Sequence, residues 1–412
     1  MSYQILEHTD SKVLGPRVAV ERKARGQTQS DLANILGVAR TTVVAIEKGD
    51  RALSPDETVR LSQTWNMPVS DLISDRPSVQ PLVPQLRAAS PSRAFGPADT
   101  QGLEESAEKL RVLCENLLEI EQLQGAQSGL DYPPVYRTGP MPPAEAAADI
   151  ALRERQRLGL GDGPIPHLRS VLENDARLRI FLIKMPSRIA GMFAFDPEFG
   201  ACVALNVLHP AERRRWTLAH EYCHFLCDRY HADVCPIPHS TPRRLSDSEK
   251  LADAFAGEFV MPATGLRRRF YELKATKSDG AVKIGDLLHL KRQYGVSFAA
   301  LVIRLEELRL VTSGTWERLK TSGFQVREAE KLVGLEAGQD TEERLPQRMI
   351  QLAVAAHVAG EVSEGRLAKW LDCDRLEARR IVDEVVRDNE LSETGDRLDG
   401  DLQLEVPVET PA

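Results

Sequence analysis

The segment His220-Glu221-Tyr222-Cys223-His224 places two histidines four residues apart, with a glutamate directly after the first. The surrounding residues predict a helix, because Ala211–Cys227 contains neither Gly nor Pro and follows Pro210, which a first helical turn tolerates. Residues four apart on a helix share one face, about 6 Å apart along the axis. Two imidazoles can therefore close on one metal ion, while Glu221 reaches a water molecule beside it.

A second helix is predicted downstream, over Ser248–Ala256, and Pro262 marks its end. Glu249 and Asp253 are four residues apart, on one face of this helix. A catalytic zinc site needs three protein ligands and one open position. Glu249 is the candidate third ligand, and Asp253 is the candidate acceptor for the N–H of a ligand histidine. The expected cofactor is Zn²⁺.

Two strand-like runs precede the metal-site helix. Ile189–Phe195 and Ala201–Val207 are separated by Asp196-Pro197-Glu198-Phe199-Gly200, which predicts a β-hairpin with a five-residue loop. Residues 135–312 are therefore expected to form an α+β domain around the metal centre.

These motifs resemble the ImmA/IrrE family of zinc metallopeptidases, and the similarity extends from about Pro142 to Thr312. It is carried by Arg215-Trp216-Thr217-Leu218-Ala219-His220-Glu221, Glu249-x-x-Ala252-Asp253-x-Phe255-Ala256 and Val260-Met261-Pro262. Trp216, Tyr222-Cys223 and Asp253 depart from the usual family residues without removing a ligand. The resemblance implies a zincin-like fold, zinc bound by His220, His224 and Glu249, and Glu221 as the catalytic base. Members of the family cleave repressor proteins.

The cysteines allow more than one interpretation. Cys223, Cys227 and Cys235 lie near the metal-site helix, where a second zinc site or a redox switch is conceivable. We favour packing in the core, because free cysteine behaves as a small buried hydrophobe. The remaining cysteines are isolated in the sequence: Cys114, Cys202 and Cys373. Six cysteines in 412 residues do not form a disulfide framework, so a reducing cytoplasm is expected.

The N-terminal residues carry a second pattern, in which Gln29–Val38 leads into Arg40–Gly49. Thr28 can cap the first helix, and Gly37 allows a sharp turn into the second. The geometry is that of a helix-turn-helix. Residues 1–75 resemble a Cro/repressor-type (XRE family) domain of five helices, with further helices around Gly15–Ala24, Pro55–Trp65 and Val69–Ile73.

This second resemblance implies binding to double-stranded operator DNA. Arg40, Thr41 and Val44 are expected to face the major groove, and Gln29 to contact DNA at its edge. Residues 12–75 contain nine basic and eight acidic residues, which is not the strongly basic footprint of a tight nonspecific binder. Affinity is therefore expected to need a dimer. The alternative is a helix-turn-helix that contacts only proteins.

The rest of the chain is less informative. Residues 76–100 form a Pro-rich linker, and residues 101–134 hold a connecting helix over Thr100–Leu123 that either dimerises or packs on the peptidase domain. Residues 313–390 are predicted to be helical, and residues 391–412 to be an acidic tail. The sequence has no apolar run of about 18 residues and no signal peptide, so no membrane span and a cytoplasmic location are expected.

Within the C-terminal region, Ser363 is a candidate cap for a helix over Arg366–Leu371, and a helix over Arg375–Val386 follows after a short turn. This spacing suits a helix-turn-helix, but αα-hairpins in general share it. No sequence repeat stands out in the chain.

The predicted fold is mainly α with a small α+β part. Two functions fit the motifs. The chain is either a DNA-binding regulator whose zinc endopeptidase cleaves a repressor or antitoxin-like protein, or a transcription factor whose protease-like domain senses a signal or zinc without proteolysis. Glu221 favours the first, because a sensor has no need of a general base. The covalent link to a DNA-binding domain favours the second.

Overall fold

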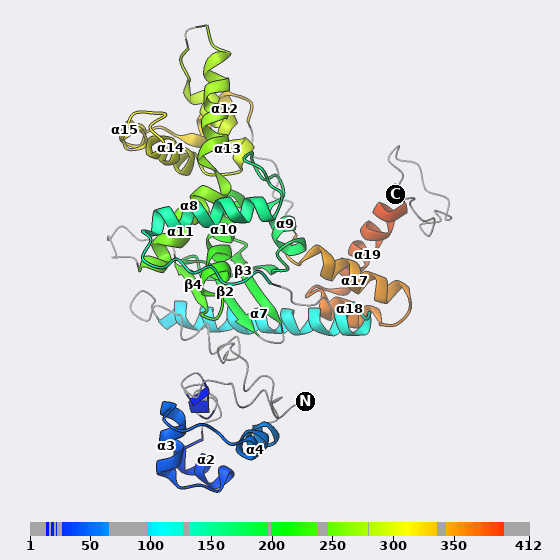
Figure 1. The fold of residues 1–412 in the computed structure, drawn as a ribbon. Coiled ribbons are helices and arrows are strands. Elements are labelled where there is room, and N and C mark those ends of the chain that lie inside the picture. Colours follow the sequence, from blue (N-terminus) through cyan, green and yellow to red (C-terminus); the bar gives the residue numbers. More distant parts are fainter. Residues whose placement is uncertain are drawn as a thin grey trace, which may run out of the picture. The chain divides into compact units, whose positions relative to one another are not determined.

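The computed structural model describes residues 14–15, 18–19, 22, 27–65, 97–126, 132–196, 199–236, 246–278, 280–335 and 343–390. The chain divides into two compact units, residues 1–81 and 82–412. Helices dominate the described residues, and a single four-stranded sheet lies in the second unit (Figure 1). This confirms the predicted mainly α fold with a small α+β part. The predicted acidic tail and most of the predicted linker lie outside the described residues.

The first unit contains α2 (Gln29–Leu36), α3 (Arg40–Lys48) and α4 (Pro55–Trp65). Thr28 caps α2 by accepting a hydrogen bond from the backbone N–H of Asp31, as the sequence predicts. Gly37 ends α2 with φ of 69°, a left-handed conformation that glycine adopts without steric cost. Apolar side chains from these helices form one buried core. The helices predicted around residues 15–24 and 69–73 fall largely outside the described residues.

The sheet of the second unit has the order β1-β3-β2-β4. Its strands are β1 (Arg179–Ile183), β2 (Ile189–Asp196), β3 (Gly200–Asn206) and β4 (Asp233–Pro236). β2 and β3 form the predicted hairpin, but their pairing extends to Asp196 and Gly200, so the connection is shorter than five residues. β1 pairs parallel to β3, and β4 pairs antiparallel to β2. Neither β1 nor β4 was predicted from the sequence.

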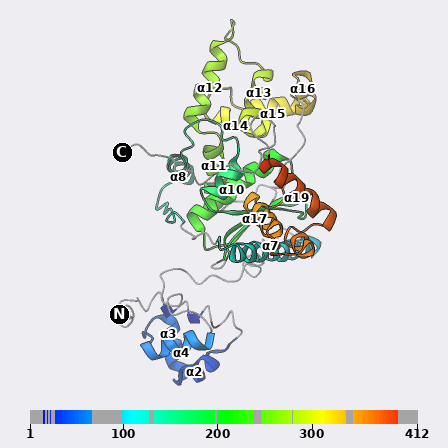
Figure 2. The same cartoon turned by 90° about the vertical axis from the view of Figure 1, so that its right-hand side faces the viewer.

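Helices cover both faces of the sheet (Figures 1 and 2). α10 (Ala211–Asp228) packs on β2 and β3, and is itself covered by α11 (Asp247–Val260), which packs on α8 (Pro143–Arg157). α7 (Pro97–Leu123) lies across the opposite face, against β1 and β3. The helix that carries the predicted metal ligands is therefore held between the sheet and a second helical layer.

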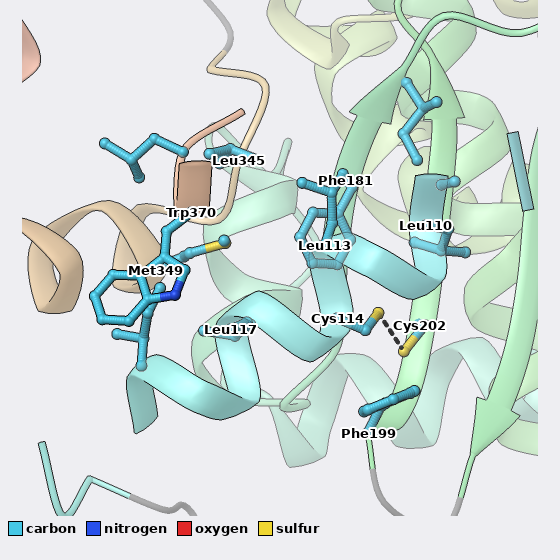
Figure 3. Packing of buried hydrophobic residues seen from close by; sticks show 14 of the residues in the cluster. Leu110, Leu113, Cys114, Leu117, Phe181, Phe199, Cys202, Leu345, Met349 and Trp370 are labelled. Carbon is cyan, nitrogen blue, oxygen red and sulfur yellow. Dashed lines mark hydrogen bonds between the residues drawn. The ribbon is translucent and has the colours of Figure 1, made fainter. Parts of the chain in front are cut away.

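α7 begins at Pro97, inside the segment predicted as linker, because proline is favoured in a first helical turn. Its apolar residues belong to the same buried cluster as the sheet and the C-terminal helices. Figure 3 shows Cys114 of α7 beside Cys202 of β3, with Met349 and Trp370 approaching from the C-terminal helices. Packing within the chain thus buries the apolar face of α7, which was expected either to form a dimer or to pack on the peptidase domain.

The remaining helices extend this unit: α9 (Leu168–Asn174), α12 (Ala263–Ala275), α13 (Ile284–Tyr294), α14 (Phe298–Glu307), α15 (Thr315–Thr321), α16 (Val326–Leu332), α17 (Gln347–Val358), α18 (Glu364–Trp370) and α19 (Arg375–Glu390). α15 packs on α14, and α16 packs on α13. α17 and α18 pack on α7. Ser363 caps α18 through the N–H of Arg366, as its sequence position predicts.

Candidate functional site

α10 buries the three polar residues of its motif against the sheet. His220 is 3% exposed, His224 5%, and Glu221 is fully buried. Gly191 of β2 makes this close approach feasible, because a Cβ at that position would lie 3.2 Å from Oε1 of Glu221 and 2.7 Å from Cγ2 of Thr217. The absence of a side chain at residue 191 therefore leaves room for the Glu221 carboxylate under β2.

α11 brings the second pair of predicted residues to α10. Ser246 caps this helix by accepting from the N–H of Glu249, which fixes the start of the turn that carries the carboxylate. Deeper in the interface, the ring of Tyr222 packs against Phe255 and Phe259 at centroid distances of 6.0 and 5.4 Å. These aromatic contacts set the spacing of the two helices and hence the position of Glu249.

The side chains of His220, His224 and Glu249 converge. The Nε2 atoms of the two histidines lie 3.2 Å apart. The Glu249 oxygens lie 3.6 Å from Nε2 of His220 and 3.5 Å from Nε2 of His224. Four-coordinate zinc with bonds of about 2.0–2.2 Å requires ligand atoms about 3.3–3.6 Å apart. The donor set and its spacing therefore fit a tetrahedral zinc ion with one position left for water or substrate.

Asp253 fixes the orientation of the first imidazole. Nδ1 of His220 lies 3.0 Å from Oδ1 of Asp253, and a hydrogen bond donated to this carboxylate turns Nε2 toward the other two candidate ligands. This is the contact expected of Asp253 from its sequence position. The side chains of Glu249 and Asp253 are 25% and 53% exposed, so the site opens to solvent on the α11 side.

The electrostatics of the site favour one positive charge. Burial acts to lower the pKa of both imidazoles. At His220 the hydrogen bond to Asp253 and the carboxylates of Glu221 and Glu249 outweigh burial and raise the pKa to about 9. At His224 burial and the neighbouring His220 lower the pKa to about 4. Three carboxylates around two imidazoles make a pocket that suits a cation.

The contact at Asp253 gives a first prediction. Asp253→Ala should weaken zinc binding about 10–100-fold, because His220 loses the acceptor that fixes its tautomer and ring orientation. A competition titration against a chromogenic zinc chelator measures this change. Asp253→Asn is the matched control, since its amide oxygen can still accept the hydrogen bond from Nδ1 of His220, and it should bind zinc within a few-fold of the unaltered chain. Equal affinities for the Ala and Asn variants would remove this role from Asp253.

A buried hydrogen-bond network behind α10 was not predicted from the sequence. Glu154 of α8 is fully buried and accepts from the hydroxyl groups of Tyr136 and Tyr222 at 2.8 and 2.5 Å. Arg157 pairs with the same carboxylate at 2.7 Å and also bonds Tyr222. The network explains why a tyrosine suits position 222, between the two histidines. A lone glutamate in an amphipathic helix gave no sequence signal of this role.

Of the cysteines near the site, Cys223 is buried as predicted, whereas Cys227 and Cys235 are half-buried. Cys223 is buried with its Sγ 4.0 Å from that of Cys227, and burial raises the pKa of the Cys223 thiol well above its usual value. Within the described residues no cysteine joins the group of converging metal-ligand atoms. Cys114 and Cys202, which are isolated in the sequence, come together in the core, where their Sγ atoms lie 3.2 Å apart.

The helix-turn-helix presents a polar surface at the start of α3. Arg40 and Thr41 are exposed, whereas Val44 is half-buried. Gln29 donates to Glu47 at 2.9 Å, and Glu47 also forms an ion pair with Arg22. Glu47 therefore ties the start of α2 to the end of α3, and Gln29 has a partner within the protein.

Comparison with known families agrees with both sites. Residues 174–306 match a peptidase family model described as an IrrE N-terminal-like domain, and residues 19–72 match a helix-turn-helix model. The chain thus carries a DNA-binding helix-turn-helix and an IrrE-like metallopeptidase domain. No curated protein and no solved structure matches the chain. Among the described residues, no helix is both long and apolar enough to cross a membrane.

Proposed function

We propose that this protein is a DNA-binding transcriptional regulator whose zinc-dependent endopeptidase cleaves a repressor or antitoxin-like protein. Such cleavage belongs to a stress response or a mobile-element programme. We place the protein in the cytoplasm, where DNA and such a substrate meet. One observation carries the peptidase half of the proposal: His220, His224 and Glu249 converge at zinc-ligand spacing beside the buried carboxylate of Glu221.

The chemistry follows from this arrangement. Bound zinc would supply a Lewis acid that activates water near neutral pH and polarises a peptide carbonyl. His220 and His224 would hold the ion through their Nε2 atoms and Glu249 through a charged oxygen, so Zn²⁺ with these three ligands would present one net positive charge to the developing oxyanion. Glu221 accepts the proton of the attacking water and passes it to the leaving amine. Its burial beside β2 keeps this carboxylate in one position.

The test is direct. The purified full-length protein, loaded with zinc, is incubated with the protein encoded by the gene next to its own, and intact mass is followed for both. We expect a discrete cut in the partner that a chelator abolishes and added zinc restores. Cleavage of neither protein at any zinc level, in a chain that holds zinc, favours the alternative function, a sensor without proteolysis.

The DNA half of the proposal rests on α3. Arg40→Ala should weaken binding to the chain's own promoter by about 1–3 kcal/mol if Arg40 makes a bidentate contact with guanine, and should relax the sequence preference at that base pair. We expect Thr41 and Val44 to contact the neighbouring bases. Gln29, which lies beside Glu47, would contact a phosphate or a base at the edge. Fluorescence anisotropy on matched promoter and scrambled duplexes measures both effects.

The control for Arg40→Ala is Lys48→Ala, which removes a positive charge from the other end of α3. It should change affinity for both duplexes equally. If Arg40→Ala and Lys48→Ala behave alike on the two duplexes, Arg40 does not read sequence.

A further inference from the structure

The C-terminal helices contain a second copy of the helix-turn-helix backbone. In the first copy, α2 ends at the left-handed residue Gly37, and α3 begins three residues later at Arg40. In the second, α18 is followed by Asp372 with φ of 53°, and α19 begins three residues later at Arg375. The likeness is one of backbone conformation, and aspartate takes the place of the turn glycine.

The two copies correspond residue by residue, without insertion or deletion. Thr28 and Ser363 occupy the same position, and each caps its helix by accepting a hydrogen bond from the N–H three residues on. The turns share a further backbone bond, from Val38 to Ala33 at 3.0 Å and from Cys373 to Ala368 at 3.1 Å. The caps and the turn therefore set the same path between the paired helices.

The buried side chains correspond as well. Leu32, Ala33 and Leu36 of α2 are buried, as are their counterparts Leu367, Ala368 and Leu371 around α18. A small alanine at the helix crossing allows close packing in both copies. α17 packs on α18 and α19 as the third helix. Trp370 anchors the copy to α7, donating from its indole N–H to Glu119 at 2.9 Å.

The exposed residues of α19 occupy the positions that we assign to DNA contacts in α3. Arg375 corresponds to Arg40, Leu376 to Thr41 and Arg379 to Val44. Leu376 is 67% exposed, and the side chains of Arg379 and Arg380 are 63% and 79% exposed. Residues 375–382 contain three arginines and one glutamate, while the acidic residues of α19 gather in its second half. In a helix-turn-helix the first half of this helix contacts the bases.

We propose that α18 and α19 form a second DNA-binding helix-turn-helix, which docks the N-terminal half of α19 in the major groove of duplex DNA. Arg375, Arg379 and Arg380 bind phosphate or guanine, and Leu376 contacts a thymine methyl group. Two binding units on one chain raise the local concentration of each for the same duplex. The second unit thereby supplies affinity for DNA that the nearly neutral first unit lacks. This proposal rests on the proposed regulatory function.

One residue of the second copy, Glu364, carries a negative charge that would repel DNA, and it gives the sharpest test. Glu364 stands at the position of Gln29, and it pairs with Arg379 at 2.8 Å across an exposed surface. Exposed ion pairs contribute little to stability, so Arg379 can exchange this partner for a phosphate. Glu364→Gln should therefore bind duplex DNA several-fold more tightly, because a carboxylate leaves the contact surface.

The experiment uses the full-length zinc-loaded chain and a duplex from its own promoter, titrated at several salt concentrations. Each phosphate contact contributes about 0.9 to the slope of log affinity against log salt, so a variant with alanine at residues 375, 379 and 380 should lose roughly 2–3 from that slope. Its affinity should fall at least about tenfold at moderate salt. A lysine variant at the same three positions should keep the slope and lose sequence preference.

The matched control removes three exposed positive charges elsewhere, at Arg269, Lys274 and Lys320. If the α19 alanine variant binds DNA as this control does, and Glu364→Gln changes nothing, the second copy does not bind DNA and contacts a protein instead. Loss of binding by Arg40→Ala alone would then leave the proposed function intact. Failure of the unaltered chain to bind any duplex would overturn both. Zinc content and thermal midpoint confirm that each variant is folded.

Discussion

A chain with Glu221→Gln should retain one equivalent of zinc and lose peptide-bond cleavage. Glutamine has nearly the same shape as glutamate, so the fully buried site under β2 keeps its packing. It cannot accept the proton of the attacking water, and general base catalysis contributes about 10²–10⁴ to such rates. We therefore expect turnover of the partner protein to fall by at least that factor, while metal analysis and thermal midpoint remain unchanged.

Glu212→Gln is the matched control for this prediction. Glu212 lies two turns earlier on α10 and pairs with Lys291 at 3.1 Å, away from the converging ligands. The Glu212→Gln variant should cleave the partner protein at the normal rate. Full activity in the Glu221→Gln variant would assign the base elsewhere. Loss of zinc in that variant would show that Glu221 supports the metal site structurally, and the activity measurement would then not report on proton transfer.

The parts of the site that the sequence predicts are local in the chain. The His-x-x-x-His spacing fixes one face of α10, and the Glu249 and Asp253 pair fixes one face of α11. Helical periodicity alone places each pair, because residues four apart share a face in any α-helix. The hairpin of β2 and β3 is equally local. The resemblance to a known family then related these pieces to one another.

Long-range contacts were not predictable in this way. The bond from Tyr222 to Glu154 and the contact of Cys114 with Cys202 join residues 68 and 88 positions apart. β1 consists of Arg179 and a run of four apolar residues, which periodicity cannot distinguish from part of a buried helix. The interior position of α7 also depends on the sheet, because an apolar stripe is the same signal for a dimer and for a core.

One residue hides the backbone likeness between the α18–α19 turn and the α2–α3 turn in the sequence. Left-handed turns are usually recognised by glycine, and Asp372 adopts the same conformation with a side chain that tolerates it. The spacing of the two helices suited a helix-turn-helix, but αα-hairpins in general share that spacing. The dihedral angle of Asp372 and the shared hydrogen bonds distinguish this turn from other αα-hairpins.

Removal of a metal ligand should have the second large effect. His220→Ala and Glu249→Ala should each lose stoichiometric zinc, with a loss of affinity larger than the roughly 10–100-fold expected for Asp253→Ala. A tetrahedral site with two protein ligands remaining cannot keep both its geometry and an open position. Metal analysis after dialysis against a weak chelator measures the stoichiometry.

Thermal unfolding gives an independent measure of the same loss. A ligand present at about 100 times its Kd stabilises the folded state by about 2.7 kcal/mol, so zinc should raise the midpoint of the unaltered chain and leave both variants unmoved. The controls are His231→Ala and Asp247→Ala, whose side chains are 78% and 83% exposed near the same helices, and both should respond to zinc normally. If Glu249→Ala binds and responds like Asp247→Ala, the third ligand lies outside α11.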